Sequence, residues 1–459
     1  MFARATGHTG SRPVAAWVGL SVVVLLIASA VLVPSATGLN VHQSTFPPLH
    51  ASWRPRVGPG TVPAIALAVV GVVFVPRAAA RWRWWGVLLG SYVLGLAWMV
   101  ALATVDGLRG IGHILDTPHE YLPTARSVTD IAAMLHTFVQ HIPLHSPGHW
   151  QIQIAGHPPG ALLFFVLLVR VGLGSGLAAG AVVVLMAATV PAAVLITLRQ
   201  LGAGAAARRA APLLVLSPAA IWMAVSGDAV FATFAAWALC CLALAGTARL
   251  RASAAAWSVG SGVLFGCCVM LSYGLPLLGV LALAVLIAAR SWRPLVWAIA
   301  GALVVVLVFA AFGFEWWRAY PVLAHRYWAG DARLRPGAYW TWANLAALSI
   351  SAGPIVGTSV AVAIARINTL STPGPGTRAV STREEVERVL VLLTVAAFVS
   401  VLIADLSQMS RSEVERIWLP FIPWLLVGTA LLPRRWRRFG LATQVVFALL
   451  AEHVLATGW

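Results

Sequence analysis

The sequence predicts an all-α protein, a polytopic bundle of transmembrane helices. Of its 459 residues, 60% are hydrophobic and only 10% are charged, whereas roughly 25% of the residues in a typical soluble domain are charged. Apolar runs recur along the chain, and a helix needs about 20 apolar residues to cross a bilayer. The period-two alternation of a membrane barrel is not seen. The composition therefore excludes a water-soluble fold.

The basic excess is explained first by membrane topology. The chain carries 31 basic residues, all of them arginine, against 14 acidic residues. A soluble protein with a net charge of +17 would suggest a nucleic-acid partner, but basic residues of membrane proteins collect in cytoplasmic loops. Most of these arginines fall in alternate loops between the apolar runs. We therefore expect no nucleic-acid partner and a multi-pass protein of the cell membrane.

The apolar runs predict thirteen spans, with the N-terminus inside and the C-terminus outside. The segment from Ala161 to Gly174 is apolar but short, which suits a helix on the outer face better than a span. It ends a long outer loop over residues 106–176. The predicted spans are 14–33, 62–76, 84–105, 177–198, 211–226, 229–247, 254–271, 275–289, 294–313, 341–365, 389–404, 417–432 and 440–457.

Three acidic residues near the outer ends of these spans are candidates for catalysis. Asp106 ends the third span, where a carboxylate opposes the helix dipole and gains nothing structural; the alternative is an ordinary polar residue that ends a span. Glu120 is bracketed by Pro118 and Pro123, which fix a turn around it. Asp228 separates two spans so closely that it must lie at the outer rim, although tight turns also favour Asp.

The long outer loop predicts a surface helix and no metal site. Residues 127–141 have the pattern of an amphipathic helix lying on the bilayer, with Ser127 as its N-cap. His141, His145 and His149 are spaced by four, as metal ligands on a helix can be. Pro143 and Pro147 break any such helix, so the spacing does not support a divalent metal, and we expect no cofactor.

The order of these motifs resembles the GT-C class of membrane glycosyltransferases, such as protein O-mannosyltransferases and lipid A aminoarabinose transferases. The matching features are Asp106 at the start of the outer loop, the helix 127–141, and His157-Pro158-Pro159 before a short apolar helix. Asp228 matches an acidic residue at the outer start of a later helix, which the chain reaches after crossing the membrane once inward and once outward. The resemblance covers residues 84–310. It departs at the N-terminus, where two helices precede the helix of Asp106. It also departs at Asp106 itself, where this chain reads Val-Asp-Gly and the family reads Asp-Glu. Ser272-Tyr273 also stands where Thr-Lys is frequent.

The resemblance implies a fold and an activity. It implies transfer of a sugar from a polyprenyl-phosphate donor to a glycan, lipid or protein of the cell envelope at the outer face. Residues 1–83 would be a two-helix extension, 84–313 the catalytic membrane module, and 314–459 a C-terminal transmembrane region. Asp106, Asp228 and Glu120 would be catalytic and His157 would bind substrate. We expect Asp106, Asp228 and His157 to line one outward cavity.

The C-terminal region adds candidate substrate-binding residues. Arginine binds phosphate through planar, bidentate hydrogen bonds, and a glutamate beside it would orient the guanidinium. Aromatic residues in the same outer loops offer stacking faces for a sugar or an isoprenoid, although an interfacial aromatic belt is the alternative. The candidates are Arg326, Arg335, Tyr339, Arg411, Glu413, Glu415 and Arg416.

Two other functions remain open at this level. A secondary transporter or lipid-linked sugar flippase would place ionisable residues or broken helices near the bilayer midplane. A structural membrane subunit would need no charged constellation. The carboxylates of this chain concentrate at the outer ends of the spans, which favours surface chemistry. The sequence does not determine the sugar, the acceptor or the stereochemistry.

Overall fold

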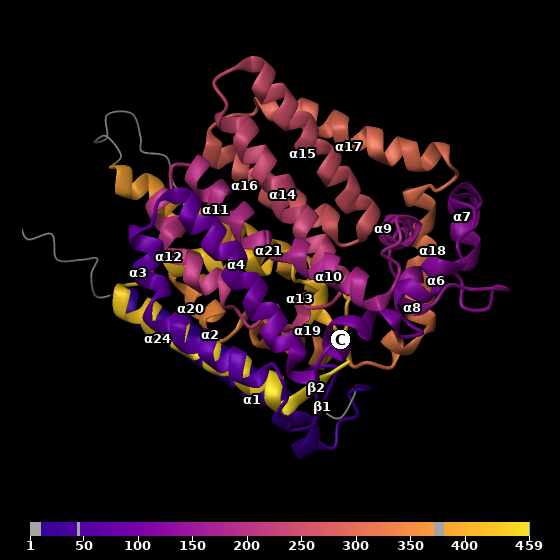
Figure 1. Cartoon of the computed structure of the whole chain (residues 1–459), viewed down its shortest axis with the longest axis horizontal. Helices are drawn as coiled ribbons and strands as arrows, with labels where there is room; N and C mark the ends of the chain where they lie inside the picture. The colour runs from indigo at the N-terminus through magenta and orange to yellow at the C-terminus, as the bar shows by residue number, and fades with distance from the viewer. Residues whose placement is uncertain (1–10, 44–45, 371–380, 459) are drawn as a thin grey trace, which may run out of the picture.

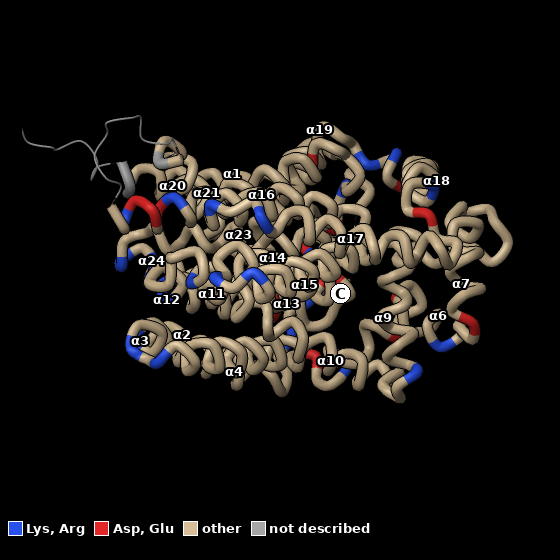
Figure 2. The backbone as a smooth tube through the Cα atoms, turned by 90° about the horizontal axis from the view of Figure 1, so that it is seen from above, with Lys and Arg blue, Asp and Glu red and all other residues tan. Residues whose placement is uncertain are grey.

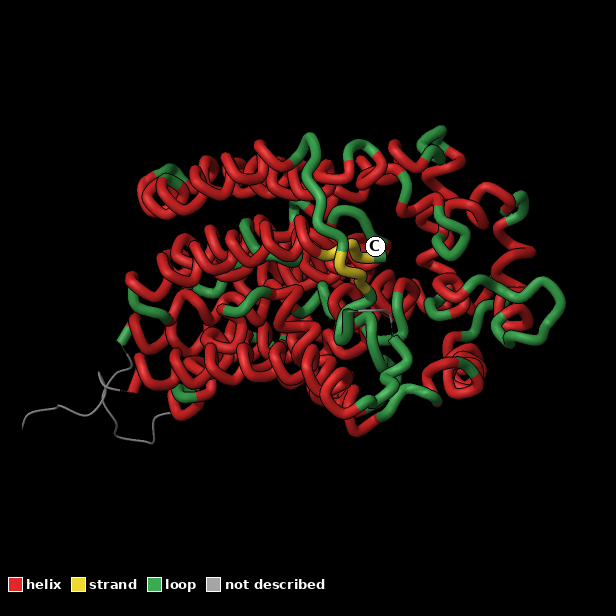
Figure 3. The backbone as a smooth tube through the Cα atoms, turned by 90° about the horizontal axis from the view of Figure 1, so that it is seen from below, coloured by secondary structure: helices red, strands yellow, loops and turns green. Residues whose placement is uncertain are grey.

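The protein is almost entirely helical. The computed structural model describes residues 11–43, 46–370 and 381–458, and in these ranges the helices are joined by short loops (Figure 3). Two short antiparallel strands, β1 (Ala51–Trp53) and β2 (Leu455–Thr457), pair beside the C-terminus. The helices of the first half are α1 (Ser11–Thr37), α2 (Thr61–Val73), α3 (Val75–Arg81), α4 (Trp84–Ala103), α5 (Arg109–Gly112), α6 (Tyr121–Ser127), α7 (Ile131–Thr137), α8 (Ile152–Ala155), α9 (Pro159–Arg170), α10 (Gly176–Ala187), α11 (Val190–Gln200), α12 (Gly204–Val215) and α13 (Ala220–Met223).

The second half continues in the same way. Its helices are α14 (Gly227–Thr247), α15 (Arg251–Leu271), α16 (Leu278–Ala289), α17 (Arg293–Ala311), α18 (Trp316–Ala329), α19 (Gly337–Ala352), α20 (Ile355–Ile364), α21 (Thr382–Leu406), α22 (Val414–Ile417), α23 (Ile422–Leu426) and α24 (Arg434–Val454).

The chain is an all-α, multi-pass membrane protein. By length and composition, 7 helices of the described chain can cross a membrane, or up to 9 if each of two bent helix pairs is one span. The other predicted spans, 211–226, 275–289, 417–432 and 440–457, fall on shorter or more polar helices: α12 with α13, α16, α23 and α24. Two of the apolar helices lie mostly exposed at the surface of the bundle, as expected for lipid contact: only 17% of the apolar stretch of α17 and 22% of that of α1 are buried.

Two helices differ from the sequence expectation. The predicted span 341–365 is bent by 110° between α19 and α20, because Gly353 adopts a positive φ of 84° and Pro354 follows it; proline disfavours helix in the residue before it. The predicted surface helix 127–141 begins later than expected. Ser127 ends α6, and the Asp130 carboxylate caps α7 by accepting from the amide of Ala133. A 3₁₀ turn over Phe138–His141 then continues α7.

Helix α14 lies at the centre of the bundle, and its first turn is buried. It is the most buried of the long apolar helices, with 78% of its apolar stretch buried. It packs against α10, α11, α15 and α16. Charged residues gather at two ends of the molecule, around α3, α12 and α24 on one side and around α6, α7 and α18 on the other (Figure 2). The short helices α6 to α9 cluster at this second side (Figure 1).

Candidate functional site

A buried ion pair joins two segments that lie far apart in the sequence. Asp228 stands in the first turn of α14, where Ser226 caps the helix and the helix dipole favours a carboxylate. Its Oδ2 lies 2.5 Å from Nη1 of Arg416, on α22. Asp228 is 2% exposed and Arg416 is 4% exposed. Each charge therefore depends on the other, because an unpaired ion is costly to bury.

Glu413 forms a second ion pair with the guanidinium of Arg416. Its Oε2 lies 2.8 Å from Nη2 of Arg416. Ser412 and Glu413 both adopt positive φ, 84° and 64°, which is uncommon for such residues and recurs at functional sites. Burial disfavours the charged guanidinium, but the carboxylates of Asp228 and Glu413 more than offset this and raise the pKa of Arg416. Arg416 is therefore a permanent cation, held between two carboxylates.

Glu120 adds an acidic side chain without a partner. It stands just before α6, is 6% exposed, and its Oε2 is buried with no hydrogen-bond partner in the described chain. Burial raises its pKa to about 7, an effect that Arg416 opposes and Asp228 reinforces. Near neutral pH this carboxyl group exists in both protonation states. Such perturbed groups beside a fixed charge are typical of functional sites.

Glu415 lies on the same short helix and is covered by the first outer loop. Its Oε1 accepts a hydrogen bond of 3.2 Å from the backbone amide of His50. Burial raises the pKa of Glu415 to about 7 and lowers the pKa of His50. We call Glu120, Asp228, Glu413, Glu415 and Arg416 the buried charge cluster.

His157 approaches this cluster from the segment before α9. Its Nδ1 lies 2.7 Å from the backbone oxygen of Gln153 and 3.0 Å from the hydroxyl of Tyr121. Its ring packs on Phe231, one helical turn into α14, with 5.3 Å between centroids. Burial lowers the pKa of His157, and Asp228 opposes that effect. His157 is thus close enough to Asp228 for the carboxylate to affect its pKa.

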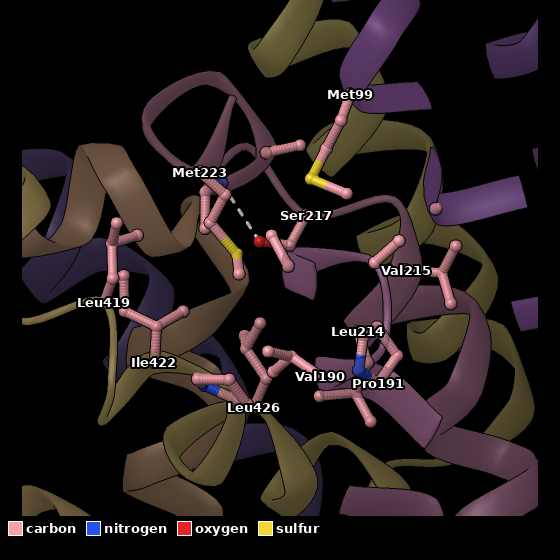
Figure 4. Close-up of a pocket in the computed structure, with 16 residues that line it drawn as sticks. Met99, Val190, Pro191, Leu214, Val215, Ser217, Met223, Leu419, Ile422 and Leu426 are labelled. Carbon is pink, nitrogen blue, oxygen red and sulfur yellow. Dashed lines mark hydrogen bonds between the residues drawn. The ribbon is translucent and has the colours of Figure 1, made fainter. Parts of the chain in front are cut away.

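A small apolar pocket, about 40 Å³ in volume, is lined in part by residues that neighbour the ion pair in sequence. Met223 in its wall ends α13, five residues before Asp228, and Leu419 follows Arg416 by three residues. Met99 of α4, Leu419 in the turn after α22, and Ile422 and Leu426 of α23 surround the hollow (Figure 4). Ser217 is the one polar residue that lines it.

Asp106 does not belong to this cluster. Its carboxylate pairs with Arg56, Oδ1 to Nε at 2.9 Å, and Arg56 also pairs with Glu452 on α24 at 2.7 Å. The Asp106 side chain is 47% exposed. The expectation that Asp106 would share a cavity with Asp228 and His157 is therefore wrong in this structure. The reason is Arg56, in the segment between β1 and α2, whose pairing with Asp106 no local sequence pattern predicts.

The other predicted binding residues hold loops in place. The guanidinium groups of Arg326 and Arg411 donate to backbone carbonyls of neighbouring loops. Arg335 donates to the carbonyls of His42 and Arg411. The buried hydroxyl of Tyr339 donates to the carbonyl of Ala30 on α1. These contacts support the site from outside the buried charge cluster, although Arg335 is close enough to lower the pKa of Glu413.

Three residues of the site were missed by sequence reasoning. His50 stands in a proline-rich loop without a motif, and Gln153 contributes only its backbone. Tyr121 follows Glu120 in the sequence, but its position against Gly227, where an added Cβ would lie 2.8 Å from its ring, depends on the fold. Among the described residues, no group of three or more His, Cys, Asp or Glu has a geometry that could hold a metal ion.

Comparison with known proteins adds no family. No protein-family model matches the chain, and no curated protein matches its sequence. The chemistry of the site is therefore argued from its own residues. A fixed cation, carboxyl groups that titrate near neutral pH and a neutral histidine together suit a ligand with an anionic group.

Proposed function

We propose that the protein is a membrane glycosyltransferase that moves a sugar from a polyprenyl-phosphate donor to an acceptor of the cell envelope. The observation that carries this proposal is the position of Arg416. It is a buried cation fixed by Asp228 and Glu413, and the chain continues directly from it into the wall of a small apolar pocket. The phosphate of a lipid-linked donor presents the complementary group.

The balance of charge is compatible with a bound phosphate. Asp228 and Glu413 orient the guanidinium, and arginine recognises phosphate oxygens by charge-assisted hydrogen bonds. Glu120 and Glu415 would repel a phosphate if they were ionised, but their pKa values of about 7 let both hold a proton. An arriving anion favours that protonated state further. With both protonated, the charges of Asp228, Glu413 and Arg416 sum to −1, so hydrogen bonds from the guanidinium, and not an excess of positive charge, would hold the phosphate.

Glu120 then has a role in the chemistry. When the bond between the anomeric carbon and the phosphate oxygen breaks, that oxygen keeps the electron pair. A protonated Glu120 can donate a hydrogen bond to the departing phosphate, as a general acid does. Asp228 serves the same step indirectly by holding Arg416. Asp106 has no part in this arrangement and keeps a structural role at its ion pair with Arg56.

The membrane arrangement that suits this proposal has thirteen spans in the cell membrane. The N-terminus is cytoplasmic, and the buried charge cluster opens at the outer face. Polyprenyl-phosphate sugars and envelope acceptors would meet there. The acceptor class, whether glycan, lipid or protein, is left open by the geometry.

The proposal is tested by binding of undecaprenyl phosphate to the purified protein in detergent. Removing Arg416 alone would leave Asp228 buried and unpaired, which typically costs about 3–5 kcal/mol. The test therefore uses the double variant Asp228→Asn with Arg416→Gln, which replaces both charged side chains by uncharged amides and leaves no member of this pair ionised. Loss of a charge-assisted contact of about 1.5–3 kcal/mol predicts affinity weaker by roughly 10- to 150-fold.

The matched control is Arg318→Ala. Arg318 is an outer-loop arginine with 74% of its side chain exposed, paired only with Glu315 in the described chain. It should bind undecaprenyl phosphate as the unaltered protein does. Equal affinity in the double variant, or equal affinity for undecaprenol, would contradict phosphate recognition by Arg416. Movement of intact polyprenyl-phosphate sugar across vesicles without cleavage would favour a flippase instead.

A further inference from the structure

His157 has a defined tautomer. Its Nδ1 lies 2.7 Å from the backbone oxygen of Gln153, and a carbonyl oxygen can only accept a hydrogen bond. The hydrogen of the neutral ring must therefore be on Nδ1. The Tyr121 oxygen, 3.0 Å from the same nitrogen, lies beside this hydrogen. The second nitrogen, Nε2, is left with its lone pair.

The lone pair of Nε2 is not used by the protein. In the part of the chain that the structure describes, Nε2 has no hydrogen-bond partner, and the residue keeps 9% of its area exposed. The titratable and charged groups around the ring are Tyr121 from α6, Asp228 from α14, and Glu413 and Arg416 from the segment of α22. Burial lowers the pKa of His157, so the ring is neutral and basic at pH 7.

Backbone packing fixes the position of this ring. Pro158 and Pro159 follow it and open α9. At Gly160 an added Cβ would lie 2.4 Å from the backbone oxygen of Met270, so α9 touches the outer end of α15 closely. Tyr121 stacks on Phe165 of α9, with ring planes 9° apart. A ring held on both sides in this way keeps one orientation, as a side chain that transfers a proton must.

We propose that Nε2 of His157 is the general base that accepts the proton of the acceptor hydroxyl. This inference rests on the proposed function and deepens it. It assigns the acceptor to the alcohols, which must lose a proton, and it separates the two proton-transfer roles. His157 serves the acceptor, and Glu120 serves the leaving phosphate. Tyr121 and the carbonyl of Gln153 are positioning groups.

The step balances as a substitution. The acceptor oxygen forms a bond to the anomeric carbon with its own electron pair, and its hydrogen passes to Nε2. The bond from the anomeric carbon to the phosphate oxygen breaks, and polyprenyl phosphate leaves with that electron pair. The products are the glycosylated acceptor, polyprenyl phosphate and an imidazolium ion. The Asp228 carboxylate favours this imidazolium, as an acidic partner does for a catalytic histidine. The ring then returns its proton to water.

The test compares an acceptor that needs a base with one that does not. His157→Asn keeps a side-chain N–H near the position of Nδ1 and removes Nε2. Purified protein is given undecaprenyl-phosphate sugars, a panel of hexoses and pentoses, and release of undecaprenyl phosphate is measured with envelope extract or with sodium azide. Azide is already an anion and needs no deprotonation. We expect the variant to lose about 10²- to 10⁴-fold of its rate with hydroxyl acceptors and to keep its rate with azide.

Two further variants keep the outcomes separate. His149→Asn changes an exposed histidine of the same outer loop and should behave as the unaltered protein. Tyr121→Phe should lower the hydroxyl rate only modestly and leave the acid limb of the pH–rate profile, which belongs to His157, in place. Equal losses with azide and hydroxyl acceptors in His157→Asn would assign His157 a structural role and overturn the inference. No release from any donor by the unaltered protein would overturn the proposed function itself.

Discussion

At the scale of single residues, the protein keeps several ionisable groups where burial is costly. Asp228 and Arg416 could be replaced by apolar residues with little loss of stability, since buried ion pairs are seldom strongly stabilising. Their presence in the interior of an apolar bundle is better explained by a ligand than by folding. The same reasoning applies to Glu120, whose Oε2 has no partner in the described chain.

Glu120 predicts how stability depends on pH. Its pKa in the folded protein is raised from 4.5 to about 7, so the folded state binds a proton that the unfolded chain releases. The resulting stability is fully present below pH 4.5 and is lost as the pH rises through 7. The unfolding temperature should therefore fall between pH 5 and pH 8. Glu120→Gln cannot ionise and should remove part of that fall, on the order of 3 kcal/mol.

Thermal unfolding of the purified protein across this pH range checks the prediction. Glu415 has a similarly raised pKa, so Glu120→Gln should reduce the pH dependence without abolishing it. Glu385→Gln, at an exposed glutamate on α21, should leave the curve unchanged. Parallel curves for Glu120→Gln and the unaltered protein would show that Glu120 is ionised throughout, which contradicts its proposed role as an acid.

The residues of the site were partly predictable from sequence. Asp228, Glu120, His157 and Arg416 were each identified, because charges next to long apolar runs are rare and therefore informative. Their partners were not. Asp228 and Arg416 lie 188 positions apart, and no local pattern predicts that pairing. For the same reason nothing predicted that Arg56 would bind Asp106 and hold it in a separate ion pair.

At the scale of elements, one buried side chain holds the loop before α22. The Asn344 amide, on α19, donates to Asp405 Oδ1 at 2.8 Å and to the carbonyl of Ser410 at 2.7 Å. Its oxygen accepts from the amide of Ser412 at 3.1 Å. These bonds fix the turn in which Ser412 and Glu413 take positive φ. Asn344 therefore helps to position Glu413 against Arg416.

Asn344→Ala should loosen this loop. It removes three hydrogen bonds from a fully buried site and leaves polar groups unsatisfied, each of which typically costs about 1–3 kcal/mol. We expect a lower unfolding temperature and faster proteolysis between α21 and α22. Asn40→Ala, at an exposed asparagine that accepts only from the His42 amide, is the control. If Asn344→Ala were as stable and as protease-resistant as this control, the positioning role would be wrong.

The elements themselves followed the sequence where apolar length was decisive. The long helices α1, α4, α14, α15, α17 and α21 lie within or around the predicted spans, because a long apolar run in lipid must satisfy its backbone as a helix. The bend at Gly353 and Pro354 was missed because apolarity continues across it. The start of α7 was missed because Ser127 and Asp130 are both good N-caps, and only the structure selects Asp130.

At the scale of the whole molecule, the small sheet places the C-terminal strand next to the segment that follows α1. Helix α1 has 27 residues, about 40 Å at 1.5 Å per residue, which is longer than the roughly 30 Å apolar core of a bilayer. The loop after α1 leads to β1, and β1 pairs with β2, with Ala51 opposite Thr457. The C-terminal strand therefore lies at the end of α1 opposite to its N-terminus.

This arrangement predicts that the two termini face opposite sides of the membrane. Helix α24 begins with four arginines in its first five residues and ends next to β2, and clustered arginines stay cytoplasmic. Alkaline phosphatase fused after residue 459 should be active, and a fluorescent protein that folds only in the cytoplasm should be dark there. Both reporters should give the reverse result in the loop at Arg249 and Arg251, between α14 and α15.

A bright C-terminal fluorescent fusion would place β2 inside the cell and, with it, β1 and the outer loop that covers Glu415. The buried charge cluster would then face cytoplasmic substrates, and transfer to an envelope acceptor at the outer face would be impossible. Topology thus tests the location of the chemistry independently of any activity assay.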